Sequence, residues 1–302
     1  MSLFLATNRA KYLRPVYSAD PNRAPVHVWD LSNDVEGGGL NHFLTVTGTF
    51  EVAGSSFCAW AEYSAQQAYL DAFFSSRSKG PSSVTVFVHG YNMDFRSAVE
   101  RLNRVSSSLG GAGYAGAVMG YGWPSAGGVL LYTRDRANAE ASVGPFFGFL
   151  EGLHAACKTR GARLNLVCHS MGNLLTALAG KTMLWQDWTV EPWVDHLVML
   201  APDVSGTLFD TGAGGEVEDP RGAGLKAMCR EVTILYNPSD SALAASEHLE
   251  HPDESRLGRV GPAGTLPAGI TAVDASKAPI RVRKHGDYFL KGPLGFWAGL
   301  LK

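Results

Sequence analysis

A serine on a predicted strand-to-helix turn is the sharpest chemical feature of the chain. Residues 164–173, LNLVCHSMGN, run from an apolar strand through Ser170 into a helix. Such a turn exposes the hydroxyl at the carboxyl end of the strand, and backbone crowding requires small residues two before and two after the serine. Gly172 meets this requirement, and Cys168 stands where glycine is usual. Because the following helix also favours developing negative charge, we interpret Ser170 as a nucleophile rather than a helix cap.

A serine hydroxyl becomes nucleophilic when a histidine accepts its proton and an acid orients that histidine. With a turn of this kind, the chain order is serine, acid, histidine. His285, in the late segment VRKHGDYF, fits this order. Two aspartates compete for the acid, each just past a predicted strand: Asp203 in VMLAPDVS and Asp240 in ILYNPSDSAL.

A second motif, VTVFVHGYN at residues 84–92, predicts a strand that ends in His-Gly. A loop beside the nucleophile commonly supplies one backbone N–H to an oxyanion hole, and the residue after the nucleophile supplies the other. Tyr91 and Met171 are therefore the predicted donors. Gly90 allows the close backbone approach that the hole requires, and His89 is predicted to be structural.

The segment GYGWPSAGG, residues 120–128, follows another predicted strand at the same edge. Trp123 is a candidate for the wall of the substrate pocket, and packing in the core is an equally good interpretation. His248 and His251 are spaced as two metal ligands on one helical turn, but no third ligand is evident and Pro252 follows. We therefore expect neither a metal nor an organic cofactor.

These residues lie among alternating short apolar runs and longer helical segments, a pattern typical of a mostly parallel sheet. The predicted strands are 83–89, 115–121, 164–168, 194–200 and 232–236. The predicted helices are 94–109, 132–158 with a kink near residues 144–145, and 172–184. Upstream strands are expected at 25–31 and 42–52, the second as an antiparallel edge. Residues 1–302 are expected to form one domain, with residues 1–40 as an N-terminal extension and first strand, and residues 205–228 and 246–269 as loops near the site.

The combined motifs resemble a family of bacterial α/β-hydrolase-fold proteins of unknown function, often labelled esterase- or lipase-like. They are ATNR at 6–9, VHGYN at 88–92, GWPS at 122–125, CHSMGN at 168–173, LAPDV at 200–204 and SDSAL at 239–243. The resemblance implies the α/β-hydrolase fold, a mostly parallel central sheet with helices on both faces. It also favours Asp240 over Asp203, since the acid usually follows the penultimate strand, and it supports His285, which an aromatic residue follows closely.

The composition excludes several other classes of protein. Twenty-six basic and 28 acidic residues give a formal net charge of −2, without the basic clusters that nucleic-acid binding requires. Four cysteines without a CxxC pair predict reduced, mostly buried thiols. No apolar stretch reaches about 18 residues, and the N-terminus does not resemble a secretion signal, so a cytoplasmic location without stable membrane insertion is expected.

Together these features predict a serine hydrolase that cleaves a small-molecule carboxylic ester through Ser170, His285 and Asp240. The same residues would also serve amide, thioester or acyl-transfer chemistry. A catalytically weak scaffold for protein binding is one alternative. A lipase acting at a membrane surface is another, suggested by the apolar tail GFWAGLL at 295–301, which more often docks on a core.

Overall fold

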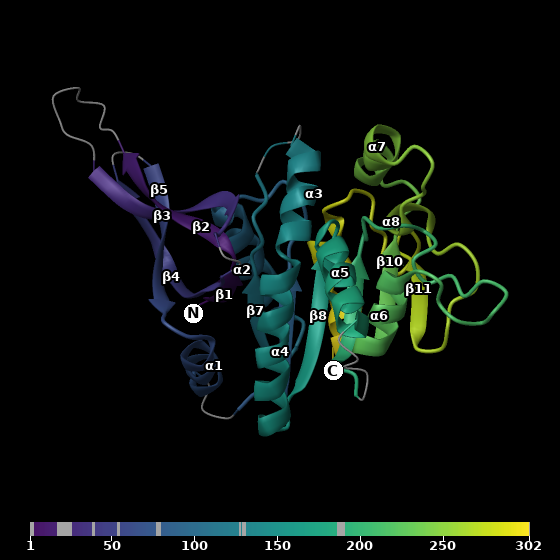
Figure 1. Cartoon of the computed structure of the whole chain (residues 1–302), viewed down its shortest axis with the longest axis horizontal. Coiled ribbons are helices and arrows are strands. Elements are labelled where there is room, and N and C mark those ends of the chain that lie inside the picture. Colours follow the sequence, from purple (N-terminus) through teal and green to yellow (C-terminus); the bar gives the residue numbers. More distant parts are fainter. Residues whose placement is uncertain are drawn as a thin grey trace.

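A large twisted sheet forms the centre of the molecule (Figure 1). The computed structural model describes residues 3–16, 26–37, 40–52, 55–76, 80–126, 128, 131–185 and 191–301. Within these residues the sheet has nine strands, in the spatial order β11 (Ile270–Asp274), β10 (Cys229–Tyr236), β9 (Val194–Leu200), β8 (Arg163–His169), β6 (Ser83–Val88), β7 (Ala117–Tyr121), β1 (Leu3–Thr7), β4 (His42–Val52) and β5 (Ser55–Tyr63). The strands from β11 to β1 are parallel, and β4 and β5 are antiparallel to their neighbours.

The parallel strands are buried on both faces, as their continuous apolar runs require. In β6, Val84, Val86 and Val88 belong to one core cluster, whereas Phe87 belongs to the cluster on the opposite face. The first cluster lies under α1 (Gln66–Ser75), α4 (Val143–Arg160), α5 (Gly172–Trp185) and α6 (Pro220–Met228). The second lies under α2 (Phe95–Gly111) and α9 (Lys291–Ala298). Figure 1 shows α4, α5 and α6 in front of the sheet and α2 behind it.

Three further helices, α3 (Tyr132–Ala141), α7 (Ser241–Glu250) and α8 (Leu257–Val260), complete this part of the fold. Figure 1 shows α3 and α7 in the upper part of the molecule. The register aligns Val88 with Cys168 and Cys168 with Met199, so β6, β8 and β9 end at one edge of the sheet. This alignment brings the loops that follow these strands together.

Local signals account for several helix boundaries. The Asp94 carboxylate caps α2 by accepting a hydrogen bond from the Ser97 N–H. Gly161 ends α4 at a φ of 64°, a left-handed conformation that glycine adopts without strain. The predicted kink in the long helix is a complete break at Ser142, which separates α3 from α4.

The five central strands and the helix 172–184 are confirmed, with ends that shift by a few residues. Three upstream and loop predictions need correction. The strand at 42–52 is not an edge, because β5 pairs along its outer side. The strand predicted at 25–31 is β3 (Val26–Val35), which pairs with β2 (Arg9–Val16) in a separate two-stranded sheet; Pro25 lies outside the described residues. The segments 205–228 and 246–269 are not wholly loops, since they contain α6, the end of α7 and α8.

The C-terminal tail docks on the core, as the more common interpretation of its sequence predicts. After η2 (Asp287–Phe289), α9 and η3 (Gly299–Leu301) bury Trp297 and Leu301 in the second core cluster. The Trp297 indole N–H donates to the Tyr288 carbonyl. All four cysteines are free thiols, and three of them are buried. None of the helices in the described ranges is long and apolar enough to span a bilayer.

Candidate active site

Ser170 occupies a strained turn between β8 and α5. Its φ is 52°, in the left-handed region that residues other than glycine rarely adopt, and its side chain is almost fully buried. The Ser170 N–H donates to the Leu200 carbonyl at 2.9 Å, and the Ser170 carbonyl accepts from the Asp203 N–H at 3.3 Å. The end of β9 therefore holds this turn from both sides.

The residues around the turn explain how it fits. A Cβ at Gly172 would lie 2.5 Å from the His89 carbonyl oxygen, so only glycine is accommodated there. Cys168 is tolerated two residues before the serine because its thiol is fully buried next to the Thr176 hydroxyl, at 3.1 Å. Burial raises the pKa of Cys168 to about 12, so the thiol stays protonated.

Asn173 is a site residue for which the sequence analysis proposed no role. Its side-chain amide donates to three carbonyl oxygens, those of Cys168, Ser170 and Leu200. These bonds tie the strained turn to the ends of β8 and β9. Its place as the last residue of the CHSMGN motif was the signal that could have identified it.

The structure brings His285 and Asp240 together. His285 lies in the loop after β11, and its Nδ1 is 2.8 Å from the Asp240 Oδ2. Because a carboxylate only accepts, Nδ1 carries the proton and donates it, which leaves Nε2 as the basic nitrogen. The Asp240 Oδ1 accepts from the N–H groups of Ala242 and Leu243, so the same carboxylate caps α7.

His169 supports His285 from the turn that carries Ser170. Its Nε2–H donates to the His285 carbonyl oxygen at 3.0 Å, and the two rings lie 4.7 Å apart. Burial, with a contribution from His285, lowers the pKa of His169 well below its ordinary value. His169 is therefore neutral, and it fixes the loop that carries His285.

Asp203, the alternative acid, has different partners. Its carboxylate accepts from the Tyr132 hydroxyl at 2.8 Å and from the Ser246 hydroxyl at 3.0 Å. Burial and the adjacent Asp203 raise the pKa of Tyr132, so the phenol remains a donor. Asp203 thus ties α3 to α7, and His285 is held by Asp240.

The loop after β6, residues 89–94, packs against the turn that carries Ser170. A Cβ at Gly90 would lie 2.9 Å from both the Ser170 Cβ and the His169 Nδ1, which confirms the close approach predicted for this glycine. Tyr91 follows on the wall of the cavity described below, and Met171 is fully buried directly after the serine. Both predicted donors therefore belong to the two segments that meet beside Ser170.

A buried aspartate braces this loop from α3. The Asp135 carboxylate accepts from the N–H groups of Asn92 and Ala126 and from the Ser125 hydroxyl. The Ser125 hydroxyl in turn accepts from the Met93 N–H at 2.9 Å. Asn92 has a φ of 61°, so these bonds also hold a strained residue.

Arg9 fastens the same loop from the beginning of β2. Its guanidinium is completely buried and donates to the carbonyl oxygens of Met93 and Ser125 and to the Asn33 side chain. Burial lowers the pKa of Arg9 to about 10, a shift that the nearby Asp94 and Asp135 oppose, so it stays charged at neutral pH. Residues of the ATNR and GWPS motifs, Arg9 and Ser125, therefore hold the loop that adjoins Ser170 in place.

Trp123 requires a correction, because the structure does not place it in the cavity wall. Its side chain is fully buried and stacks on the His89 ring, with the two ring centres 5.2 Å apart. Its Nε1–H donates to the His89 carbonyl. His89 donates through Nδ1 to the Gly90 carbonyl, and burial lowers its pKa to about 3. Trp123 thus packs behind the residue that faces the cavity, and His89 has the predicted structural contacts.

A cavity of about 420 Å³ opens at this edge of the sheet, within the size range of small-molecule sites. Ser170, His285 and Asp203 line it, together with residues of the loop after β6 and of α7. Much of the remaining lining is apolar: Phe87, Tyr91, Met93, Tyr132, Ala242, Leu243 and Ala245. Of the two segments predicted as loops near the site, 246–269 contributes Ser246, whereas 205–228 contributes no lining residue.

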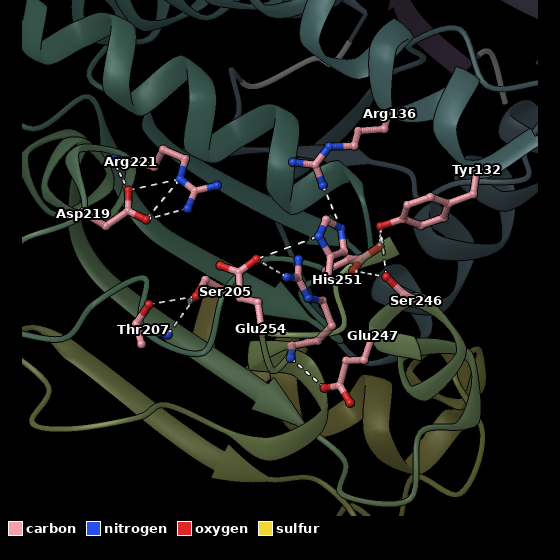
Figure 2. Close-up of polar contacts among 12 residues, drawn as sticks. Tyr132, Arg136, Ser205, Thr207, Asp219, Arg221, Ser246, Glu247, His251 and Glu254 are labelled. Atoms are coloured by element: carbon pink, nitrogen blue, oxygen red, sulfur yellow. Dashed lines mark hydrogen bonds and ion pairs between the residues drawn. The ribbon is translucent and has the colours of Figure 1, made fainter. Parts of the chain in front are cut away.

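Polar contacts hold α7 against α3 beside this cavity (Figure 2). Figure 2 shows the Tyr132 hydroxyl beside Ser246, and His251 between Arg136 and Glu254. The Arg136 guanidinium donates to the His251 Nε2 at 2.8 Å. Across the described ranges, no group of three or more His, Cys, Asp or Glu side chains is placed to hold a metal ion.

A mostly parallel sheet covered on both faces, with a serine on the strained turn after a central strand, defines the α/β-hydrolase fold. The chain belongs to the family described as "Alpha/beta hydrolase of unknown function (DUF900)", whose sequence profile matches residues 62–294. This range contains every motif of the resemblance except ATNR at 6–9, which precedes it.

The similarity to individual proteins is low. The chain is 25% identical over 273 residues to the uncharacterized protein alr1448 of Nostoc sp. (strain PCC 7120), covering 68% of this chain and 70% of the relative. Among solved structures, an esterase of Pyrobaculum calidifontis has 12% identity and a TM-score of 0.41, covering 75% of this chain and 78% of its own. A dienelactone hydrolase of Anabaena variabilis has 12% identity and a TM-score of 0.40. The match covers 97% of this chain and 95% of the dienelactone hydrolase.

Proposed function

We propose that the protein is a serine hydrolase that cleaves a carboxylic ester through an acyl-enzyme. The observation that carries this proposal is the His285–Asp240 hydrogen bond, because His285 and the strained Ser170 line the same cavity. In that bond the histidine has the tautomer that a general base for serine requires.

In the proposed reaction, the Ser170 Oγ attacks the ester carbonyl while the His285 Nε2 accepts its proton. The resulting oxyanion is held by the backbone N–H groups of Tyr91 and Met171. His285 then donates the proton to the departing alcohol. Water, activated by the same histidine, releases the acid from Ser170 and restores the enzyme.

Buried side chains around the site hold the proposed oxyanion donors in place. Oxyanion donors are effective only when the protein fixes them before the reaction, since they then need no reorganisation. Asp135 and Arg9 hold the loop that carries Tyr91, and Asn173 holds the turn that carries Met171. All three side chains are buried.

The test is hydrolysis of p-nitrophenyl esters of increasing acyl length by the wild type, Ser170→Ala and His285→Ala. We expect a pre-steady-state burst of p-nitrophenol from the wild type and loss of that burst in both variants. Ser239→Ala is the matched control, because this exposed serine adjoins Asp240 without lining the cavity. A correctly folded wild type without a burst or turnover on any ester would favour the scaffold interpretation.

A further inference from the structure

One cation on the cavity wall is not neutralised by an acidic partner. Arg101 extends from α2 into the lining of the cavity that contains Ser170 and His285. Its guanidinium lies over the Phe289 ring, 4.6 Å from the ring centre, and the residue is half-buried. Among the described residues, no hydrogen bond or ion pair to this guanidinium is present beyond that ring contact.

Neighbouring arginines show how unusual this arrangement is. On the same helix, Arg96 pairs with Glu100 at 3.0 Å and Arg104 approaches the same carboxylate at 3.8 Å. Glu100 thus forms ion pairs with the two exposed arginines on either side of Arg101 in the sequence. Burial and the positive charge of Arg104 both lower the pKa of Arg101, and no carboxylate raises it.

The acid on the cavity wall does not compensate for Arg101. Asp203 is the acidic side chain among the lining residues, and its oxygens accept from the hydroxyls of Tyr132 and Ser246. Those partners come from α3 and α7, whereas Arg101 and Phe289 come from α2 and η2. The other titratable groups of the lining are His89, His169, His285, Tyr91 and Tyr132, none of which bears a negative charge at neutral pH.

The charge of Arg101 also reaches the histidines of the site. Burial is the main cause of the lowered pKa values of His89 and His169, and Arg101 lowers both further. A half-buried guanidinium without a carboxylate is costly, since its donors have lost part of their water without gaining a protein acceptor. Its planar donors match the paired oxygens of a carboxylate or a phosphate.

Resting on the hydrolase function proposed above, we infer that Arg101 binds an anionic group of the substrate, so that the preferred esters carry a carboxylate or a phosphate. The ester carbonyl meets Ser170, the anionic group meets the guanidinium, and the apolar lining covers the connecting carbon chain. Arg101 then acts as a specificity-determining residue rather than as part of the proton relay.

The test compares kcat/KM for pairs of esters that differ mainly in charge. p-Nitrophenyl hemiglutarate against p-nitrophenyl valerate places the carboxylate on the acid portion. 4-Carboxyphenyl acetate against phenyl acetate places it on the alcohol portion, and 4-phosphonooxyphenyl acetate replaces the carboxylate with a phosphate. Rates are corrected for spontaneous hydrolysis.

We expect the wild type to prefer the charged member of at least one pair. Arg101→Gln should lower the ratio of charged to neutral kcat/KM by about 10-fold to 100-fold, the usual effect of losing a hydrogen bond to a charged group. Arg101→Lys, which keeps the charge without the planar fork, should retain part of the preference. Arg104→Gln is the matched control: it removes an exposed charge one turn further along α2 and should leave the ratio unchanged.

Labelling of Ser170 by an uncharged fluorophosphonate separates this inference from the hydrolase proposal. A wild type that is labelled and hydrolyses esters, but prefers neutral ones, overturns the anionic subsite alone. An equal change of the ratio in Arg101→Gln and Arg104→Gln also overturns it, since the effect would then come from net charge. A folded wild type that is neither labelled nor active contradicts the hydrolase proposal itself.

Discussion

Two buried aspartates follow the ends of β9 and β10, and their hydrogen-bond partners differ in kind. Asp203 follows β9 and accepts from two hydroxyls, which join α3 to α7. Asp240 follows β10, caps α7 through one oxygen and accepts from His285 through the other. The same residue type at neighbouring strand ends thus joins two helices in one place and holds His285 in the other. The difference arises from what the later loops bring to each carboxylate.

Replacing each aspartate by asparagine should affect ester hydrolysis very differently. Asp240→Asn should lower kcat on esters by about 10⁴-fold, since the amide no longer enforces the tautomer in which the His285 Nε2 is basic. Asp203→Asn should cost less than about 10-fold, because it weakens hydroxyl contacts outside the proton relay. Single-turnover kinetics on one activated ester measures both, and the reverse ranking would make Asp203 the acid.

A third buried aspartate extends the comparison to the loop after β6. Asp135→Asn removes one carboxylate oxygen from a site that now accepts three hydrogen bonds, so the loop that carries Tyr91 should lose its fixed position. We expect kcat to fall by about 10²-fold, the cost of losing one oxyanion donor, with a smaller change in KM. Circular dichroism and thermal melting of the variant show whether the fold is retained. A loss confined to KM would place the role of Asp135 in binding.

The sequence predicted much of the site because its residues lie at strand ends, where a short motif fixes position. Gly172 and Gly90 are examples, since crowding restricts what each position accepts. The choice between Asp203 and Asp240 depended on which loop returns His285, a contact 45 residues apart that no local pattern encodes.

Strands whose place in the sheet depends on distant pairing were not predicted from the sequence. β1 enters the sheet beside β7, more than 100 residues away, and β5 extends the sheet beyond β4. Trp123 was a pocket candidate because it follows a strand at the same edge, with packing in the core as an equal alternative. The stacking partner that decides for the core, His89, comes from another strand end. The cytoplasmic location and the nature of the ester stay predictions.

His89 contrasts with His285, because it faces a carbonyl oxygen where His285 faces a carboxylate. Its pKa of about 3 in the folded protein lies below the unfolded value of about 6.5. Unfolding therefore takes up a proton below pH 6.5, and the stability present above that pH is lost as the pH falls towards the folded pKa. We expect about 1.4 kcal/mol to be lost between pH 7.5 and 5.5 through this histidine. Urea unfolding of wild type and His89→Asn at both pH values measures the difference, and identical pH dependence would refute it.

Two variants of Asp240 separate its contact with His285 from its cap on α7. Asp240→Asn keeps a side chain that caps α7, whereas Asp240→Ala removes it. Both variants should lose activity alike, but the alanine variant should be less stable by about 1 kcal/mol. Urea unfolding midpoints test this, and equal stability would show that the cap contributes little here.

Mapping the adduct of a fluorophosphonate by peptide mass spectrometry is the direct test of Ser170 as the nucleophile. We expect one stoichiometric adduct on Ser170 in the wild type, none in Ser170→Ala, and much slower labelling in His285→Ala. A folded wild type that stays unlabelled, or an adduct on a residue other than Ser170, would contradict it.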